Sequence, residues 1–157
     1  MSQSETIAQP RAPLALLVTL MVTSQVAITI FLPSMPSIAE DLGTTQSLVQ
    51  LTVSAYLGAF AVAQLVVGPI SDAIGRRKPM LIGLVLFTLA SLACSAATSI
   101  EFLIAGRIIQ AFGGCVCIAI SRAIVRDTSD GAAATRAMAY LGMSLAVAPT
   151  LAPLLGG

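Results

Sequence analysis

The sequence contains no histidine and few charged residues. Without histidine, the chain lacks the side chain that most often serves as a general base or as a metal ligand. Asp, Glu, Lys and Arg make up 10% of its 157 residues, against about 25% in an average soluble protein. The formal net charge is +1, so no strong positive field is available to bind a nucleic acid. These shortages exclude a soluble enzyme, a disordered chain and a nucleic-acid-binding protein.

Hydrophobic residues, by contrast, make up 57% of the chain and form long runs between the charges. Four stretches contain no charged residue, and a fifth, 102–121, contains only Arg107. A helix of about 20 apolar residues can cross the ~30 Å hydrocarbon layer of a membrane. The sequence therefore predicts an all-α membrane protein with a tail at residues 1–13. It predicts five transmembrane helices, at 14–34, 47–69, 80–98, 102–121 and 137–157.

The basic residues indicate how these spans are oriented. Seven of them lie in the tail, the second loop or the fourth connection: Arg11, Arg76, Arg77, Lys78, Arg122, Arg126 and Arg136. The first and third loops carry only acidic residues. Because cytoplasmic loops carry the excess of Lys and Arg, we predict a cytoplasmic N-terminus. The first span could instead be a secretory signal, but its apolar run exceeds the usual length of about 7–15 residues and four more spans follow.

The stretch GPISDAIGRRK, at the predicted cytoplasmic end of the second span, is the most distinctive in the chain. Gly68 would allow another backbone to approach closely, and Gly75 would supply a turn. Asp72 can accept hydrogen bonds from a guanidinium or from a helix N-terminus. Arg76 and Arg77 can anchor the loop at the anionic lipid surface. A plain positive-inside loop would also explain this composition.

Arg107 is the one charged residue inside a predicted span. An ionisable residue within the membrane is by default a candidate for a functional site. Gln110 follows three residues later and so lies on the same helix face. The two residues would form a polar stripe that faces the interior of the bundle. Because Arg107 is close to the start of its span, its side chain could instead extend to the membrane surface.

Other residues inside the spans could shape or line a cavity. Proline removes a backbone donor and can kink a helix; the candidates are Pro33, Pro36, Pro149 and Pro153. The first two could equally just end the first span. Gln25 and Thr29 are polar residues that could line a cavity, although the Thr29 hydroxyl could also bond to its own helix.

We expect no metal site, disulfide or cofactor. Cys94, Cys115 and Cys117 all lie in predicted spans, and the last two point to different sides of one helix. All seven acidic residues fall in loops or in the tail. The one charged side chain inside a predicted span is therefore that of Arg107, and an arginine does not readily release its proton.

Four motifs, in this order along the chain, resemble those of a known family. Residues 31–43 resemble the end of the first span in drug:proton antiporters, especially those of the Bcr/CflA type. Residues 68–78 are similar to the G-x-x-x-D-x-x-G-R-[RK] loop of the major facilitator superfamily. Residues 107–114 look like the fourth-span R-x-x-Q-G-x-G motif, and residues 148–157 look like the fifth-span antiporter motif G-P-x-x-G-G.

This resemblance implies a role for each motif. Residues 68–77 would form a conformational-switch loop, and Arg107 and Gln110 would act as a proton relay or line the substrate cavity. The antiporter motif would comprise Pro149, Pro153, Gly156 and Gly157. Several positions depart from the family pattern: Ala111, Ala148 and Ala152 replace usual glycines, and Thr29 stands where many relatives carry Asp. A hydroxyl cannot carry a proton as a carboxylate can, so a proton role at that position is in doubt. Because proton antiport needs a titratable group at depth, the carboxylate that carries the proton is expected outside this chain, unless coupling works in another way.

The resemblance also implies a twelve-helix fold built as two halves, of which this chain would be a fragment or a truncated product with five helices. We expect the amino-terminal part of a secondary transporter in the bacterial inner membrane. Its partners would be the lipid bilayer, protons and a small organic substrate, with the missing carboxyl-terminal half required for activity. The expected activity is proton-coupled drug efflux. The alternatives are an uptake carrier for a sugar or organic acid, and a truncated remnant that does not transport.

Overall fold

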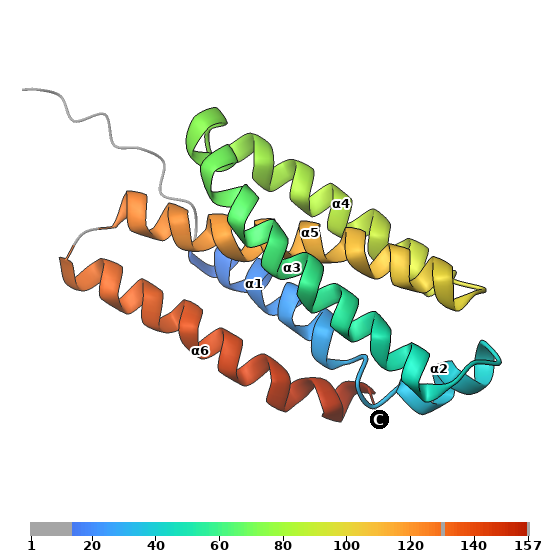
Figure 1. Ribbon diagram of the computed structural model, residues 1–157. Coiled ribbons are helices and arrows are strands. Elements are labelled where there is room, and N and C mark those ends of the chain that lie inside the picture. The colour runs from blue at the N-terminus through green and yellow to red at the C-terminus, as the bar shows by residue number, and fades with distance from the viewer. Residues whose placement is uncertain (1–13, 130, 157) are drawn as a thin grey trace, which may run out of the picture.

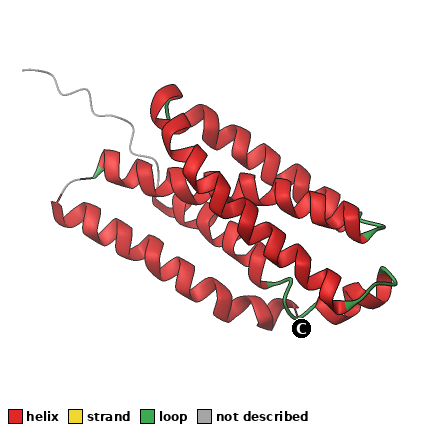
Figure 2. Cartoon of the chain, in the orientation of Figure 1, coloured by secondary structure: helices red, strands yellow, loops and turns green. Residues whose placement is uncertain are grey.

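The computed structural model describes residues 14–129 and 131–156, with the backbone alone described from 144 onward. These residues form an all-helical bundle without strands (Figures 1 and 2). The helices are α1 (Leu14–Thr29), α2 (Met35–Asp41), α3 (Gln46–Ile74), α4 (Arg77–Ser95), α5 (Ile100–Thr128) and α6 (Gly131–Gly156). The predicted all-α class is confirmed.

Among the residues that the structure describes, α3, α4 and α5 are long and apolar enough to cross a membrane. Helix α1 is apolar but shorter, at 16 residues, or about 24 Å. Large apolar side chains on the outer faces of α3 and α4 are strongly exposed, including Leu65 at 78% and Ile82 at 66%. In water such a surface would be unfavourable, whereas lipid tails accommodate it. The fold is therefore that of a membrane protein.

Helix α5 is the central element, because it packs against α1, α3, α4 and α6 (Figure 1). Its contact with α4 depends on small residues. A Cβ atom on Gly113 would lie 2.6 Å from the backbone nitrogen of Phe87 and 2.7 Å from the carbonyl oxygen of Gly83. Only glycine at 113 allows this approach without a shift of the backbone. The close approach brings the polar residues of α4 and α5 together.

Polar caps fix where two of the long helices begin. The Thr45 side chain accepts a hydrogen bond from the Leu48 amide at 3.4 Å, and the Ser99 hydroxyl accepts one from the Phe102 amide at 3.3 Å. These contacts satisfy amides that have no partner within the helix. At its other end, α3 stops at Gly75, whose φ of +85° suits glycine.

The helices differ from the predicted spans at several ends. Helix α1 stops at Thr29, and residues 30–34 form turns before the short helix α2, which the sequence analysis did not predict. Pro33 lies in these turns, where its missing donor is harmless, and Pro36 lies in the first turn of α2. The α1–α2 bend places the aromatic ring of Phe31 inside the bundle.

Helices α3 and α5 extend beyond the predicted limits. Asp72 lies on α3, while Arg122 and Arg126, predicted in a connection, lie on α5 and Arg136 lies on α6. Hydropathy marks where apolar side chains stop, but the backbone hydrogen bonds of a helix can continue past that point. A basic residue in the last turn of α5, Arg126, also suits the negative end of the helix dipole.

Candidate functional site

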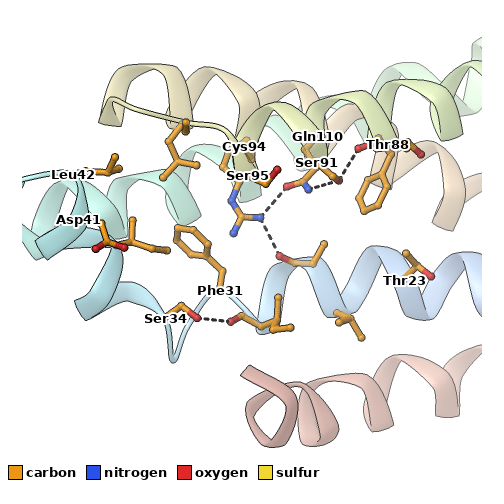
Figure 3. A pocket seen from close by; sticks show the side chains of 18 of the residues that line it. Thr23, Phe31, Ser34, Asp41, Leu42, Thr88, Ser91, Cys94, Ser95 and Gln110 are labelled. Atoms are coloured by element: carbon orange, nitrogen blue, oxygen red, sulfur yellow. Dashed lines mark hydrogen bonds between the residues drawn. The ribbon is translucent and has the colours of Figure 1, made fainter. Parts of the chain in front are cut away.

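A cavity of about 870 Å³ lies between α1, α2, α4 and α5 (Figure 3). Its walls are mainly apolar and include Ile30, Leu84, Phe87 and Leu103. Hydroxyl groups enter it from α1, from the turn after α1 and from α4, namely those of Thr23, Ser34, Thr88, Ser91 and Ser95. An apolar chamber with a few polar groups is typical of a site for a small organic molecule.

Arg107 lies on the lining of this cavity and is only 5% exposed. Its Nη1 donates hydrogen bonds to the Ala27 carbonyl oxygen at 3.0 Å and to Gln110 Oε1 at 2.9 Å. Gln110 Nε2 in turn donates to Ser91 Oγ at 2.7 Å (Figure 3). This network connects α1, α5 and α4 through side chains. The structure thus brings together Arg107 and Gln110, as their spacing indicated.

Aromatic rings complete the surroundings of the guanidinium. The Arg107 Cζ lies 3.9 Å from the centroid of the Phe31 ring and 5.7 Å from that of Tyr56. A cation over an aromatic face is attracted to it, more strongly where water is excluded. Within the described part of the chain, Arg107 forms no ion pair. The guanidinium is turned inward and is held by a carbonyl, an amide and rings.

Two predicted lining residues lie elsewhere. Gln25 and Thr29 are not on the lining of the cavity, and Thr29 Oγ1 donates to the Gln25 carbonyl oxygen of its own helix at 3.2 Å. The cavity instead meets the side of α1 that carries Thr23 and Ala27. Packing determines which side of α1 faces α5. The sequence of α1 does not reveal this side, because the helix carries polar residues on more than one side.

The sequence analysis also missed three residues of the site. The Phe31 ring lies against the Arg107 guanidinium, and Ser91 accepts a hydrogen bond from Gln110. Asp41 lies on the lining of the same cavity. Asp41 was assigned to a loop, and the structure places it at the end of α2. The neighbouring prolines were a signal for a bend that could return this segment toward the bundle.

A second polar cluster links the end of α3 to the end of α5. Arg76 pairs with Asp72, its Nε donates to Asp127 Oδ2 at 2.9 Å, and its Nη1 donates to Ser71 Oγ at 2.7 Å. Desolvation lowers the pKa of Arg76, but the hydrogen bonds to Asp127 and Asp72 outweigh it and raise the pKa above its usual value. The sequence analysis did not predict that Asp127 pairs with Arg76. An acidic residue close to Arg122 and Arg126 was a signal that it could form an ion pair.

Of the other predicted switch residues, Gly68 contributes its carbonyl oxygen, which accepts a hydrogen bond from Ser71 Oγ at 2.9 Å. Arg77 is exposed, and a Cβ atom on Gly68 would meet no described atom within 4 Å. Pro149, Pro153 and Gly156 lie in α6, where side chains are not described. Gly157 lies outside the described residues.

Of the three cysteines, Cys94 alone lies on the lining of the cavity. Cys94, Cys115 and Cys117 are free thiols, and the last two are buried. Across residues 14–129 and 131–156, the structure contains no group of His, Cys, Asp and Glu suited to hold a metal ion. The chemistry of the site therefore centres on Arg107 and the two polar clusters.

The profile of the Major Facilitator Superfamily matches residues 17–157. The chain belongs to this superfamily. It is 46% identical over 130 residues to the uncharacterized MFS-type transporter YdgK of Bacillus subtilis (strain 168), covering 83% of the chain and 32% of that protein. It is 38% identical over 144 residues to multidrug resistance protein D of Escherichia coli (strain K12), covering 92% of the chain and 36% of that protein.

A third relative is the chloramphenicol resistance protein of Pseudomonas aeruginosa, which is 38% identical over 127 residues. That alignment covers 80% of the chain and 30% of the relative. The chain thus spans about a third of the length of the curated relatives that it matches. Membership of the superfamily and the apolar helices together make it a multi-pass membrane protein.

Proposed function

We propose that this chain forms the amino-terminal part of a proton-coupled efflux transporter for drugs or other small organic molecules, of the Bcr/CflA type. One observation carries the proposal: a buried arginine, bonded to three helices through one network, lines an apolar cavity of about 870 Å³. The names of the relatives, which include multidrug and chloramphenicol resistance proteins, support this choice.

In this proposal Arg107 keeps its proton and acts through its charge and its hydrogen bonds. A carboxylate from the remainder of the carrier that approaches the guanidinium would be stabilised in its ionised form and would give up a proton. When the carboxylate moves away or binds a proton, Arg107 would return to the Ala27 carbonyl and to Gln110. Protonation and the packing of α1 against α5 would then be coupled.

The cluster of Arg76, Asp72 and Asp127 would act as the conformational switch. It joins the ends of α3 and α5 and would stabilise one state of the transport cycle. We place it on the cytoplasmic side of a bacterial inner membrane, with the N-terminus in the cytoplasm, because basic residues accumulate on that side. Opening the cavity to this side would require the cluster to separate.

The intact protein that carries this sequence provides the test. Inverted membrane vesicles are energised, and proton release on addition of chloramphenicol is followed with a pH-sensitive dye. We expect drug-dependent proton movement in the parent and none with Arg107→Ala, because the network loses its centre. Arg122→Ala removes an exposed arginine from the same helix and should behave as the parent.

Two results would contradict the proposal. Proton movement by Arg107→Ala at the parent's rate would show that the buried arginine is not needed for coupling. Substrate accumulation in whole cells, with no export from them, would favour an uptake carrier for a sugar or organic acid. Expression of residues 1–157 alone addresses the remnant alternative. We expect no resistance from it, because transport in this fold takes place between two halves and this chain would supply only part of one.

A further inference from the structure

The guanidinium of Arg107 has a donor that the chain itself leaves unused. Nη1 makes both hydrogen bonds of the network, whereas Nε is buried and has no partner among the described residues. An N–H group that is buried without a partner is unfavourable, and more so on a charged group. The Arg107 residue as a whole is only 5% exposed, and it lies on the cavity lining. Nε itself is closed off from the cavity, so the donor that Arg107 offers to a ligand there is Nη2, from which no described residue accepts a hydrogen bond.

Among the described residues, no carboxylate forms an ion pair with the Arg107 guanidinium. Asp41 is the carboxylate on the lining of the cavity; it is exposed, lies at the end of α2, and forms no ion pair with Arg107. Figure 3 shows Asp41 at the α2 end of the cavity, away from Gln110 and Ser91. A charge held beside apolar walls attracts anions and repels cations more strongly than it would in bulk water.

The apolar walls next to Arg107 suit a flat ring. Phe31 faces the guanidinium, while Leu84, Phe87 and Leu103 provide apolar surface around the cavity. The hydroxyls of Thr88, Ser91 and Ser95 on α4 are neutral polar groups of the same lining. A ligand with an aromatic body and one anionic oxygen group would bury the ring against these walls and accept a charge-assisted hydrogen bond from the guanidinium.

We propose that Arg107 makes this cavity selective by charge, so that it binds aromatic carboxylates and disfavours aromatic cations of the same shape. The inference rests on the proposed function, in which the cavity receives the transported molecule. It goes beyond that function because it names the class of ligand and the atom that selects it. Cationic compounds would bind only if the remainder of the carrier brought a carboxylate close to Arg107.

Three probes of similar shape and different charge test the inference: 2-naphthoate, neutral 2-naphthamide and 2-naphthylmethylammonium. Their binding to the intact protein that carries this sequence is measured by equilibrium dialysis in lipid nanodiscs, with empty discs subtracted. We expect 2-naphthoate to bind at least about tenfold more tightly than the amide, the lower end of what a hydrogen bond to a charged group contributes. The ammonium probe should bind most weakly.

Two substitutions identify the selecting group. Arg107→Gln should remove the preference for 2-naphthoate, and Arg107→Lys should retain the order of the three probes because the charge remains. Arg122→Gln removes an exposed arginine from the same helix and should leave all three affinities unchanged. Elution of each variant as a single species in size-exclusion chromatography shows that it is folded. If Arg107→Gln does not fold, Arg107→Met, which also removes the charge and keeps a long side chain, replaces it and should likewise lose the preference.

Equal affinity for the three probes, preference for the cation, or absence of binding by all three would overturn the inference. A preference that survives in Arg107→Gln would also overturn it. The proton-movement assay separates this outcome from failure of the proposed function. Chloramphenicol-dependent proton movement without charge selection would support the proposed function and reject the inference. Charge selection without proton movement would support the inference and reject the proposed function.

Discussion

At the scale of single residues, the arrangement around Arg107 depends on the shape of the side chain as well as on its charge. One nitrogen, Nη1, serves both the Ala27 carbonyl and Gln110, while the planar group lies over the Phe31 ring. A lysine ammonium carries the same charge but cannot form the same flat fork or stack in the same way. A lysine substitution can therefore separate the role of the Arg107 charge from the role of its geometry.

Arg107→Lys should consequently restore little of the export lost in Arg107→Ala. We expect less than about a tenth of the parental rate, because a hydrogen bond to a charged group contributes about 1.5–3 kcal/mol. Transport into inverted vesicles measures this, with the amount of inserted protein determined by immunoblot. Export by the lysine variant at the parental rate would show that charge alone suffices at this position.

At the scale of helices, the site depends on how closely α4 approaches α5. Ser91 on α4 reaches Gln110 on α5 only because Gly113 lets the two backbones come together. A bulkier residue at 113 would collide with the backbone at Phe87 rather than with a movable side chain. Packing and the polar network are thus linked at the level of this helix pair.

Gly113→Val should lower the melting temperature of the intact protein in detergent and reduce export. Overpacking of this kind costs about 1–3 kcal/mol. Gly58→Val is the matched control, since a Cβ atom at 58 on α3 would meet no described atom within 4 Å. The melting temperature is followed by thiol-reactive dye as the buried Cys115 and Cys117 become accessible. Equal melting temperatures for the two valine variants would argue against a tight α4–α5 contact.

The polar cluster at the ends of α3 and α5 leads to a second prediction at this scale. Asp72→Asn and Asp127→Asn should each reduce transport while insertion continues, because each removes one partner of Arg76. Both carboxylates are partly exposed, so the effect on stability should be small, about 0–1 kcal/mol. The effect should therefore appear in the transport rate rather than in the melting temperature. Transport at the parental rate in both variants would reduce the cluster to a topology signal.

At the scale of the whole molecule, the orientation of the bundle in the membrane remains a prediction that α5 makes easy to test. Its 29 residues extend about 43 Å, more than the hydrocarbon thickness. Ser99 and Ser129 flank it at opposite ends. A side chain at each end should therefore contact water on a different side of the membrane.

Single cysteines at Ser99 and Ser129, in a protein whose three native cysteines are replaced by alanine, should be labelled from opposite faces. We expect a membrane-impermeant maleimide to label Ser99→Cys in intact cells and Ser129→Cys only in inverted vesicles. The reverse pattern would place the N-terminus outside. Labelling of both positions in intact cells would contradict a spanning α5.

The sequence by itself determined the helical class, the apolar runs that form α3, α4 and α5, and the common helix face of Arg107 and Gln110. Hydropathy is a property of neighbouring residues, and a separation of three residues fixes a common helix face whatever surrounds it. The bend after α1 was also readable from Pro33 and Pro36, although the short helix that follows it was not.

Only the tertiary structure decided what these residues contact. Arg107 bonds to Ala27 across 80 positions of the chain, Arg76 to Asp127 across 51, and Gln110 to Ser91 across 19. No local pattern specifies such partners, because they depend on how each helix is rotated against its neighbours. The same rotation directed Thr29 toward its own backbone and left Thr23 on the cavity lining, so the polar face of α1 was settled by packing around α5.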